Sequence, residues 1–243
     1  MDIVIENLKK TFGEKCAVNI PNYTIHSGDL LGLVGNNGAG KSTLFRLIMD
    51  LIKADEGIVR MVGNFQDQQV DIDVKTTEDW KEWTGSFIDE GFLIDYLTPD
   101  EYFAFVAKIC GVSQDALEAH LALYERFMNG EVLGQKKLIR NLSAGNKQKV
   151  GIIAAMIQQP KVLILDEPFN FLDPSSQSAI KHILQQYNKE TGATILISSH
   201  NLNHTTDICP RIALLENGVI IRDIMNENNS AEKELEEYFE IKD

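Results

Sequence analysis

The chain has 243 residues and a formal net charge of −13, and 44% of its residues are hydrophobic. This length supports one large α/β domain or two small ones, and the composition excludes a disordered or fibrous chain. The negative charge argues against a protein body that wraps nucleic acid by neutralising phosphates. Three distant cysteines, Cys16, Cys110 and Cys209, indicate neither a disulfide framework nor a zinc site. The start of the chain lacks a signal-peptide pattern, and no apolar run reaches the roughly 20 residues of a membrane-spanning helix.

The first third of the chain predicts strands around a glycine-rich turn. Residues 2–8 and 22–29 indicate short strands, and the apolar run 30–35 is typical of a buried parallel strand. A helix is expected directly after the turn. Residues 57–83 are polar with little periodicity, which favours exposed hairpins or loops.

Residues 98–159 have a helical pattern. Thr98 is the expected N-cap of a helix, with Pro99 at its first position, Glu101 completing a capping box and Gly111 ending it. A second amphipathic helix is expected over residues 113–128.

The last third alternates strands and helices. Strands are expected at 161–168 and 193–200, with a helix at 174–192 between them. A hairpin is expected at 211–224, turning at Asn217-Gly218. The acidic tail is either a closing amphipathic helix with Leu235, Tyr238 and Phe239 facing inward or a solvated appendage.

Residues 35–43, GNNGAGKST, fit the pattern G-x-x-x-x-G-K-[ST] of a phosphate-binding loop and lie between a buried strand and a helix. Glycines let backbone N–H groups turn toward phosphate oxygens, and the helix N-terminus adds partial positive charge. Lys41 is expected to reach the β- and γ-phosphates, Ser42 to ligate Mg²⁺, and Thr43 to contact the α-phosphate. A glycine-rich turn with an accidental Lys-Ser is the alternative. The candidate nucleotide-binding residues are Gly35, Asn36, Asn37, Gly38, Ala39, Gly40, Lys41, Ser42 and Thr43.

Two carboxylates, Asp166 and Glu167, follow the apolar run 162–165. Ligands of open α/β sheets bind at the carboxyl ends of the strands. Asp166 is expected to hold Mg²⁺ through water, and Glu167 to polarise the attacking water as general base. The alternative is that Asp-Glu-Pro simply terminates a strand.

His200 ends the next apolar run, where an imidazole can hydrogen-bond a γ-phosphate oxygen or position water. The other histidines, His26, His120 and His182, are interpreted as structural or exposed. His204 lies four residues after His200, but this segment lacks the Glu of a helical zinc site, so no metal is expected there.

Five motifs, taken in order, resemble those of the ATPase subunit of ATP-binding cassette transporters. They are the phosphate loop, NLSAGNKQK at 141–149, VLILDEP at 162–168, NFLDP at 170–174 and ISSH at 197–200. The resemblance covers nearly the whole chain and implies ATP and Mg²⁺ as cofactors. It implies one α/β domain over residues 1–243, a P-loop NTPase with a mostly parallel central sheet, an antiparallel β lobe and a helical lobe. The core would span about 1–88 and 157–243, and the helical lobe about 89–156.

The resemblance also assigns roles to residues outside the phosphate loop. Two copies of such a domain meet head to tail, so Ser143 and the N–H of Gly145 would contact the γ-phosphate bound by the other copy. Ser143 as an ordinary N-cap is the alternative. Phe12 falls at the position that stacks on adenine, with core packing as the alternative. Asp173 matches the aspartate that shapes the dimer contact, with a helix N-cap as the alternative.

The chain departs from the family pattern at two places in particular. Ala144 and Asn146 replace the second Gly and the Gln of the usual signature Leu-Ser-Gly-Gly-Gln. Asp89 occupies the place at which the family commonly has a Gln that touches Mg²⁺, with Glu90 beside it. We expect Asp89 to make hydrolysis slower or more Mg²⁺-dependent than a Gln would.

The next segment, residues 92–96, carries the apolar side chains Phe92, Leu93, Ile94 and Tyr96. They are either buried in the helical lobe or form a patch that receives a coupling helix of a membrane subunit.

The sequence predicts the ATP-hydrolysing, energy-coupling subunit of a transporter, of the exporter class, driven by ATP-dependent dimer closure. Its expected partners are ATP, a separate transmembrane permease, and a second nucleotide-binding domain in a homodimer or heterodimer, without nucleic acid. It would lie in the cytoplasm, attached to the membrane through the permease. The alternatives are a soluble cassette ATPase that remodels a nucleic-acid or ribosome complex, and a small-molecule kinase.

Overall fold

A six-stranded sheet in the order β10-β9-β3-β8-β7-β6 forms the centre of the molecule. The structure is a computed structural model that describes residues 1–227 and 230–240. Neighbouring strands are parallel except β9 and β10, which form an antiparallel hairpin. β3, β7 and β8 are buried throughout, as expected for parallel strands covered on both faces. The strands are β3 (Leu30–Val34), β6 (Thr84–Phe87), β7 (Val162–Leu165), β8 (Thr194–Ser199), β9 (Arg211–Glu216) and β10 (Val219–Met225).

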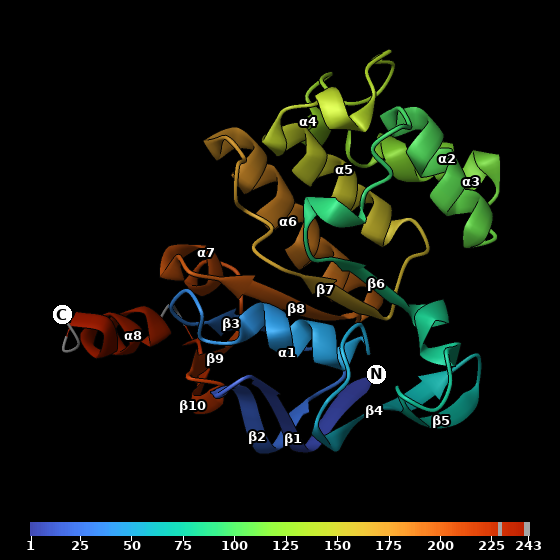
Figure 1. The fold of residues 1–243 in the computed structure, drawn as a ribbon. Coiled ribbons are helices and arrows are strands. Elements are labelled where there is room, and N and C mark those ends of the chain that lie inside the picture. The colour runs from blue at the N-terminus through green and yellow to red at the C-terminus, as the bar shows by residue number, and fades with distance from the viewer. Residues whose placement is uncertain (228–229, 241–243) are drawn as a thin grey trace.

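A second, antiparallel sheet has the order β2-β1-β4-β5. Figure 1 shows it at the bottom of the molecule, with α1 (Lys41–Ile48) between it and the parallel sheet. Side chains of α1 pack in one apolar core with residues of both sheets. The predicted α/β class with a mostly parallel sheet and an antiparallel lobe is therefore confirmed. The strands of this sheet are β1 (Asp2–Phe12), β2 (Lys15–Ile25), β4 (Glu56–Phe65) and β5 (Gln68–Asp73).

The polar segment 57–83 forms the expected hairpin, β4 with β5, but it also contributes to the core. The short 3₁₀ helix η1 (Asp79–Trp83) that follows buries both Trp80 and Trp83. Residues three apart lie on the same side of a 3₁₀ turn, so one turn can bury both rings although its other residues are polar.

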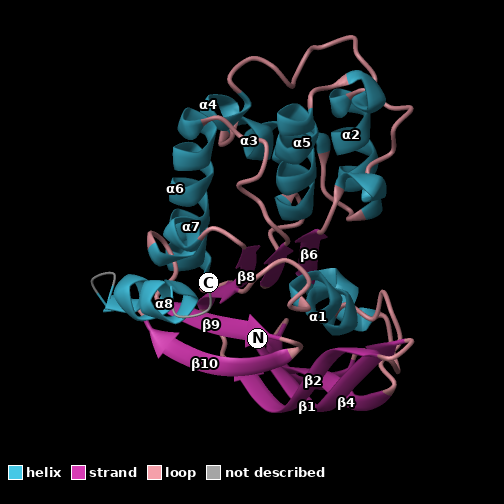
Figure 2. Ribbon diagram, turned by 60° about the vertical axis from the view of Figure 1, so that its left-hand side comes forward, coloured by secondary structure: helices cyan, strands magenta, loops and turns pink. Residues whose placement is uncertain are grey.

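Helices α2 to α5 gather on the side of the parallel sheet opposite the antiparallel sheet (Figures 1 and 2). α2 begins at Thr98 with the predicted capping box, in which Thr98 and Glu101 bond each other's backbone. The single helix expected over 113–128 is wrong, because the chain turns at Leu123 and Tyr124. α4 begins after this turn and buries Phe127 and Met128. These helices are α2 (Pro99–Ile109), α3 (Gln114–Ala122), α4 (Glu125–Met128) and α5 (Ala144–Met156), with short 3₁₀ helices η2 (Glu90–Phe92) and η3 (Ile139–Asn141).

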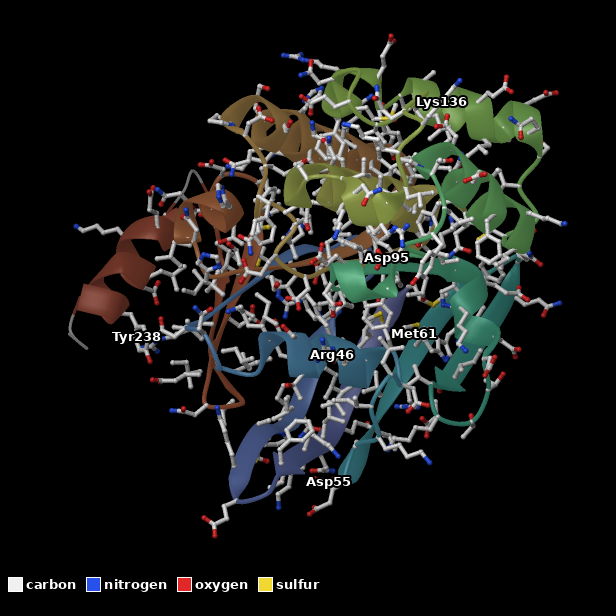
Figure 3. The ribbon with its side chains drawn as sticks, turned by 45° about the horizontal axis from the view of Figure 1, so that its top comes forward. Arg46, Asp55, Met61, Asp95, Lys136 and Tyr238 are labelled. Carbon is white, nitrogen blue, oxygen red and sulfur yellow. The ribbon has the colours of Figure 1, made fainter. Side chains whose placement is uncertain are left out.

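The remaining helices are α6 (Pro174–Thr191), α7 (Leu202–Thr206) and α8 (Ser230–Glu240). Of the two alternatives for the acidic tail, the structure has the closing helix, α8, and Leu235 is buried. Tyr238, labelled in Figure 3, donates a hydrogen bond from its hydroxyl to Glu216. The side chain of Phe239 lies outside the described residues. Among the residues that the structure describes, no helix combines the length and the apolar character needed to cross a bilayer.

Candidate active site

The predicted motifs meet at the carboxyl edge of the parallel sheet. β3 lies beside β8, and β8 lies beside β7, all in the same direction. The phosphate loop follows β3, Asp166 and Glu167 follow β7, and His200 follows β8. Three segments far apart in sequence thus supply one site at the edge where α/β sheets bind ligands.

The phosphate loop encloses its own lysine. Gly40 has a φ of 111° directly before α1, and an added Cβ there would lie 2.3 Å from the Ala17 carbonyl oxygen, so only glycine fits. Lys41 is buried, and its Nζ donates to the carbonyl oxygens of Gly35 at 2.6 Å and of Asn36 at 3.4 Å. The ammonium group therefore lies inside the loop, beside the N-terminus of α1.

A cavity of about 300 Å³ opens beside this loop. Phe12 borders this cavity, and 53% of its surface is exposed, which rules out the alternative of core packing. Lys15 also borders the cavity and donates from its Nζ to the Gly38 carbonyl oxygen at 3.3 Å. The cavity has an aromatic face, a glycine-rich wall and ammonium groups, which suits a nucleotide with its phosphates. Its lining residues are Phe12, Lys15, Ala17, Asn37, Gly38, Ala39, Gly40, Lys41, Ser42, Thr43 and Glu167.

Glu167 is the carboxylate that faces the cavity, between two cationic or polar groups. One oxygen lies 2.9 Å from His200 Nδ1, and the other lies 3.7 Å from Lys41 Nζ. Its backbone is left-handed, with a φ of 49°, and its N–H donates to Ser198 Oγ at 2.8 Å. Gln148 Nε2 donates to its carbonyl oxygen at 3.1 Å. Strained backbone held by fixed partners is typical of functional positions.

Asp166 and Ser42 have the donor atoms that a magnesium nucleotide needs. Asp166 does not line the cavity itself; it is buried next to Glu167, and the hydroxyl of Ser198 donates a hydrogen bond to its carboxylate and fixes its orientation. Ser42 lies in the first turn of α1 and borders the cavity. Mg²⁺ prefers oxygen ligands and binds through one or two carboxylates together with phosphates. These two residues therefore fit the predicted metal.

Asp89, the third predicted metal ligand, is not among the residues that line this cavity. One of its oxygens lies 3.0 Å from Arg46 Nη2, and the other accepts the N–H of Gly91 at 2.8 Å. Arg46, labelled in Figure 3, lies on α1. Asp89 is therefore paired with a residue of α1, the helix whose first turn carries the end of the phosphate loop. Its role toward Mg²⁺ stays a prediction.

Ser143 and Asp173 both act as helix N-caps in the single chain. Ser143 Oγ accepts the N–H of Asn146 at 3.2 Å, at the start of α5. Asp173 accepts bonds from the N–H and hydroxyl groups of Ser175 and Ser176, which hold the pKa of its carboxyl well below its usual range. Neither residue lines the cavity described above, so their predicted roles toward a second copy stay predictions.

Gly145 has a structural reason to be glycine. A Cβ added there would lie 2.6 Å from the carbonyl oxygen of Phe171. Any larger residue at this position would push the start of α5 away from the loop that carries Glu167. The predicted contact of its N–H with a phosphate is compatible with this packing, and it stays a prediction.

Sequence reasoning missed two groups that hold the site together and one that holds Asp89. Ser198 binds both Asp166 and the backbone of Glu167, Gln148 binds the Glu167 carbonyl, and Arg46 pairs with Asp89. A polar residue near the end of β8 was the available signal for Ser198. The other two come from helices whose position relative to the sheet no local pattern reveals.

Residues 18–170, more than half of the chain, match the family model described as ABC transporter. The chain belongs to this family. It is therefore an ATP-binding cassette, an ATPase and the ATP-binding subunit of an ABC transporter.

The cassette is similar to transport proteins with different named cargo. It is 34% identical over 232 residues to the bacitracin transport ATP-binding protein BcrA of Enterococcus faecalis, covering 92% of this chain and 70% of BcrA. It is 32% identical over 221 residues to the methionine import ATP-binding protein MetN of Clostridioides difficile strain 630, covering 90% of this chain and 67% of MetN. The dimeric structure of MJ0796, a bacterial ABC transporter cassette, has the same fold, with a TM-score of 0.78 at 24% identity, covering 93% of this chain and 99% of that one.

Proposed function

We propose that the cassette hydrolyses ATP at sites shared by two nucleotide-binding domains and passes the closing motion to a separate permease that exports its cargo. The observation that carries this proposal is the convergence of Glu167, His200 and Lys41 beside the phosphate-loop cavity. The second nucleotide-binding domain and the permease are inferred from two exposed surfaces, and the direction from a similarity to a known transport protein.

Each residue of the cavity has its own role in ATP binding or hydrolysis. Phe12 stacks on the adenine, and the loop N–H groups bind the phosphates. Lys41 exchanges the carbonyl oxygens of Gly35 and Asn36 for phosphate oxygens. Glu167 takes the proton of the attacking water, a role that contributes about 10²–10⁴-fold to the rate. His200 orients Glu167 through its Nδ1–H, and in the imidazolium form its Nε2–H also donates to a γ-phosphate oxygen.

Ser42, and Asp166 through water, would hold Mg²⁺, which would supply positive charge to offset the charge of the ATP phosphates.

The start of α5 supplies the second half of the site to another copy. Ser143 and Ala144 are exposed there, and the first turn of α5 carries no acidic residue. A helix N-terminus of this kind attracts an anion such as the γ-phosphate. Ala144 adds only a methyl group, so it leaves the N–H groups open.

The permease surface is the apolar patch of Phe92, Ile94 and Tyr96, whose exposed fractions are 52%, 36% and 73%. Leu93, expected in this patch, is buried instead and fixes the segment to the core. A hollow of about 190 Å³ next to Phe92 is lined by residues of β6, α2 and α5. Exposed aromatics beside a hollow are typical of a docking surface. With this surface on the permease, the cassette lies on the cytoplasmic side of the membrane.

We choose the outward direction and a peptide antibiotic as the class of cargo. The support is the similarity to BcrA, whose name records bacitracin transport. MetN, named for methionine import, supports the opposite direction, so direction needs its own experiment.

The test of hydrolysis and dimerisation uses the Glu167→Gln variant of the purified cassette. We expect it to lose hydrolysis and, with ATP, to sediment as a dimer, since ATP stays bound without its general base. A strictly monomeric protein that transfers phosphate to a small molecule would overturn the proposal. For direction, cells that carry the cassette with its permease should tolerate more bacitracin than cells that carry Glu167→Gln. Equal tolerance together with ATP-driven solute uptake would reverse the direction.

A further inference from the structure

Glu167 is held on both sides of its backbone by side chains from other elements. Its N–H donates to Ser198 Oγ at 2.8 Å, and its carbonyl oxygen accepts a hydrogen bond from Gln148 Nε2 at 3.1 Å. The two planar peptide groups that flank a residue set its φ and ψ, so these bonds together decide the direction in which the side chain leaves the backbone. Ser198 is fixed in turn, because its hydroxyl donates to Asp166. Gln148 is therefore the second of two supports that aim the Glu167 carboxylate.

The backbone of Glu167 needs such supports because it is left-handed. Its φ is 49°, in a region that residues other than glycine and asparagine rarely adopt. In this conformation one carboxylate oxygen lies 2.9 Å from His200 Nδ1, and the other lies 3.7 Å from Lys41 Nζ beside the cavity. Relaxation to a negative φ would swing the side chain in another direction and lose both distances. The surroundings therefore maintain the strain, as is typical of functional positions.

Gln148 reaches this carbonyl group from α5, on a face of the helix that also contacts Phe171. Gly145 and Gln148 are three residues apart in α5, so they lie on one face of the helix. Gly145 packs against the carbonyl oxygen of Phe171, which an added Cβ would approach to 2.6 Å. Phe171, with a φ of 62°, is the other left-handed residue of the loop 166–173. α5 thus contacts the carbonyl groups of both strained residues of this loop.

A bond that only attached the loop to the rest of the molecule would not have to be made at Glu167. Phe169 is buried in the core, and its carbonyl oxygen accepts a hydrogen bond from Gln177 Nε2 at 3.1 Å. These contacts already attach the loop. The side chain of Gln148 is buried, and its bond is made to the loop residue whose carboxylate faces the cavity. The bond therefore acts on the direction of this carboxylate rather than on attachment of the loop.

We propose that Gln148 is a positioning residue for ATP hydrolysis, which holds the left-handed backbone of Glu167 and so keeps its carboxylate directed into the cavity. The inference rests on the proposed role of Glu167 as the general base. Gln148 does not line the cavity itself. Its loss should therefore slow the proton transfer to Glu167 and leave ATP binding intact, because a base displaced by about 1 Å can cost about 10²-fold in rate.

The test replaces Gln148 by methionine, which keeps the length of the side chain and removes its N–H donor. Steady-state hydrolysis by the purified cassette should show a kcat that is lowered about tenfold or more. The KM for ATP and the binding of a fluorescent ATP analogue should be unchanged. The matched control is Gln177→Met, which removes the same kind of bond from the same loop, at Phe169 instead of Glu167. Its melting temperature should fall about as much as that of Gln148→Met, but its kcat should equal that of the parent.

A double-mutant cycle separates positioning of the base from a general effect on the site. Glu167→Gln removes the base, so adding Gln148→Met to this variant should leave its residual single-turnover rate unchanged. A purely structural role of Gln148 would instead lower the rate by the same factor with and without Glu167. If Gln148→Met fails to fold, Gln148→Leu takes its place, as a second apolar side chain without a donor.

Three results would overturn the inference and leave the proposed function intact. They are a parent-like kcat in Gln148→Met, an equal loss of kcat in Gln177→Met, and equal losses with and without Glu167. Normal hydrolysis in Glu167→Gln alone would overturn the proposed role of Glu167 and the inference with it. Failure of both Gln148 variants to fold, while Gln177→Met folds, would make Gln148 a structural residue and also reject the inference.

Discussion

The carboxylate of Asp89 forms an ion pair with Arg46 at 3.0 Å. Arg46 lies on α1, one helical turn after Ser42. The next residue, Glu90, pairs at 3.0 Å with Lys147, one turn after Ser143. Two adjacent carboxylates thus connect the helix of the phosphate loop with the helix proposed to serve the other ATP site. The Asp89 pair is 40% and 46% exposed, so it contributes only about 0–1 kcal/mol and can open.

We expect Asp89→Gln to reach its half-maximal ATPase rate at a lower Mg²⁺ concentration than the parent. The substitution replaces a carboxylate that Arg46 holds by a neutral amide, which is free to reach the metal. The measurement is hydrolysis as a function of Mg²⁺. Glu90→Gln is the control, since it makes the same change of charge one residue later and should keep the Mg²⁺ dependence of the parent. Identical curves for Asp89→Gln and parent would refute a role of Asp89 toward the metal.

His200→Ala is expected to lower kcat by about 10²-fold, because Glu167 loses the imidazole that orients it at 2.9 Å. Binding of a fluorescent ATP analogue should change little, since the phosphate loop is intact. His182→Ala, which removes an exposed histidine of α6, should leave kcat unchanged. Equal loss of ATP binding and kcat would show that His200 supports the fold of the loop rather than the chemistry.

Ser143→Arg is expected to retain ATP binding and to lose ATP-dependent dimerisation and hydrolysis, since the long cation blocks the end of α5. The change also removes an N-cap worth about 1 kcal/mol of stability. Ser113→Arg is the matched control, because Ser113 caps α3 through the N–H of Ala116 and lies outside the site. It should show a similar loss of stability with normal hydrolysis. Normal hydrolysis in Ser143→Arg would count against the composite site.

His120 should make the fold less stable in mild acid. Burial lowers its pKa below the usual value, so the unfolded chain binds this proton more readily than the native protein does. Its contribution to the free energy of unfolding is complete above an unfolded pKa of about 6.5 and is lost as the pH falls from there toward the lower native pKa. In His120→Gln, the free energy of unfolding measured with urea should depend less on pH between about pH 6.5 and pH 5 than in the parent. This range lies above the one in which most carboxylates titrate. His182→Gln is the control, and its free energy of unfolding should change with pH as in the parent. An unchanged pH dependence in His120→Gln would refute the role of His120.

Much of the fold and of the site could be predicted because the chemistry lies in contiguous residues. The phosphate loop contains its glycines and Lys41 within nine residues, and Thr98 meets Glu101 within one turn of a helix. The turn at Asn217-Gly218 has two positive φ angles, as a tight hairpin requires. Local sequence determines these features, since each needs only its own neighbours.

The tertiary structure decided which distant groups meet. Ser198 reaches Asp166 only because β7 and β8 are neighbours in one register, in which Leu165 pairs with Ile197. Nothing local shows that Arg46 meets Asp89, 43 residues later, or that Phe171 is exposed while Phe169 is buried. Strand order, helix placement and backbone handedness set these contacts, and they follow from packing the whole chain rather than from the pattern of any one segment.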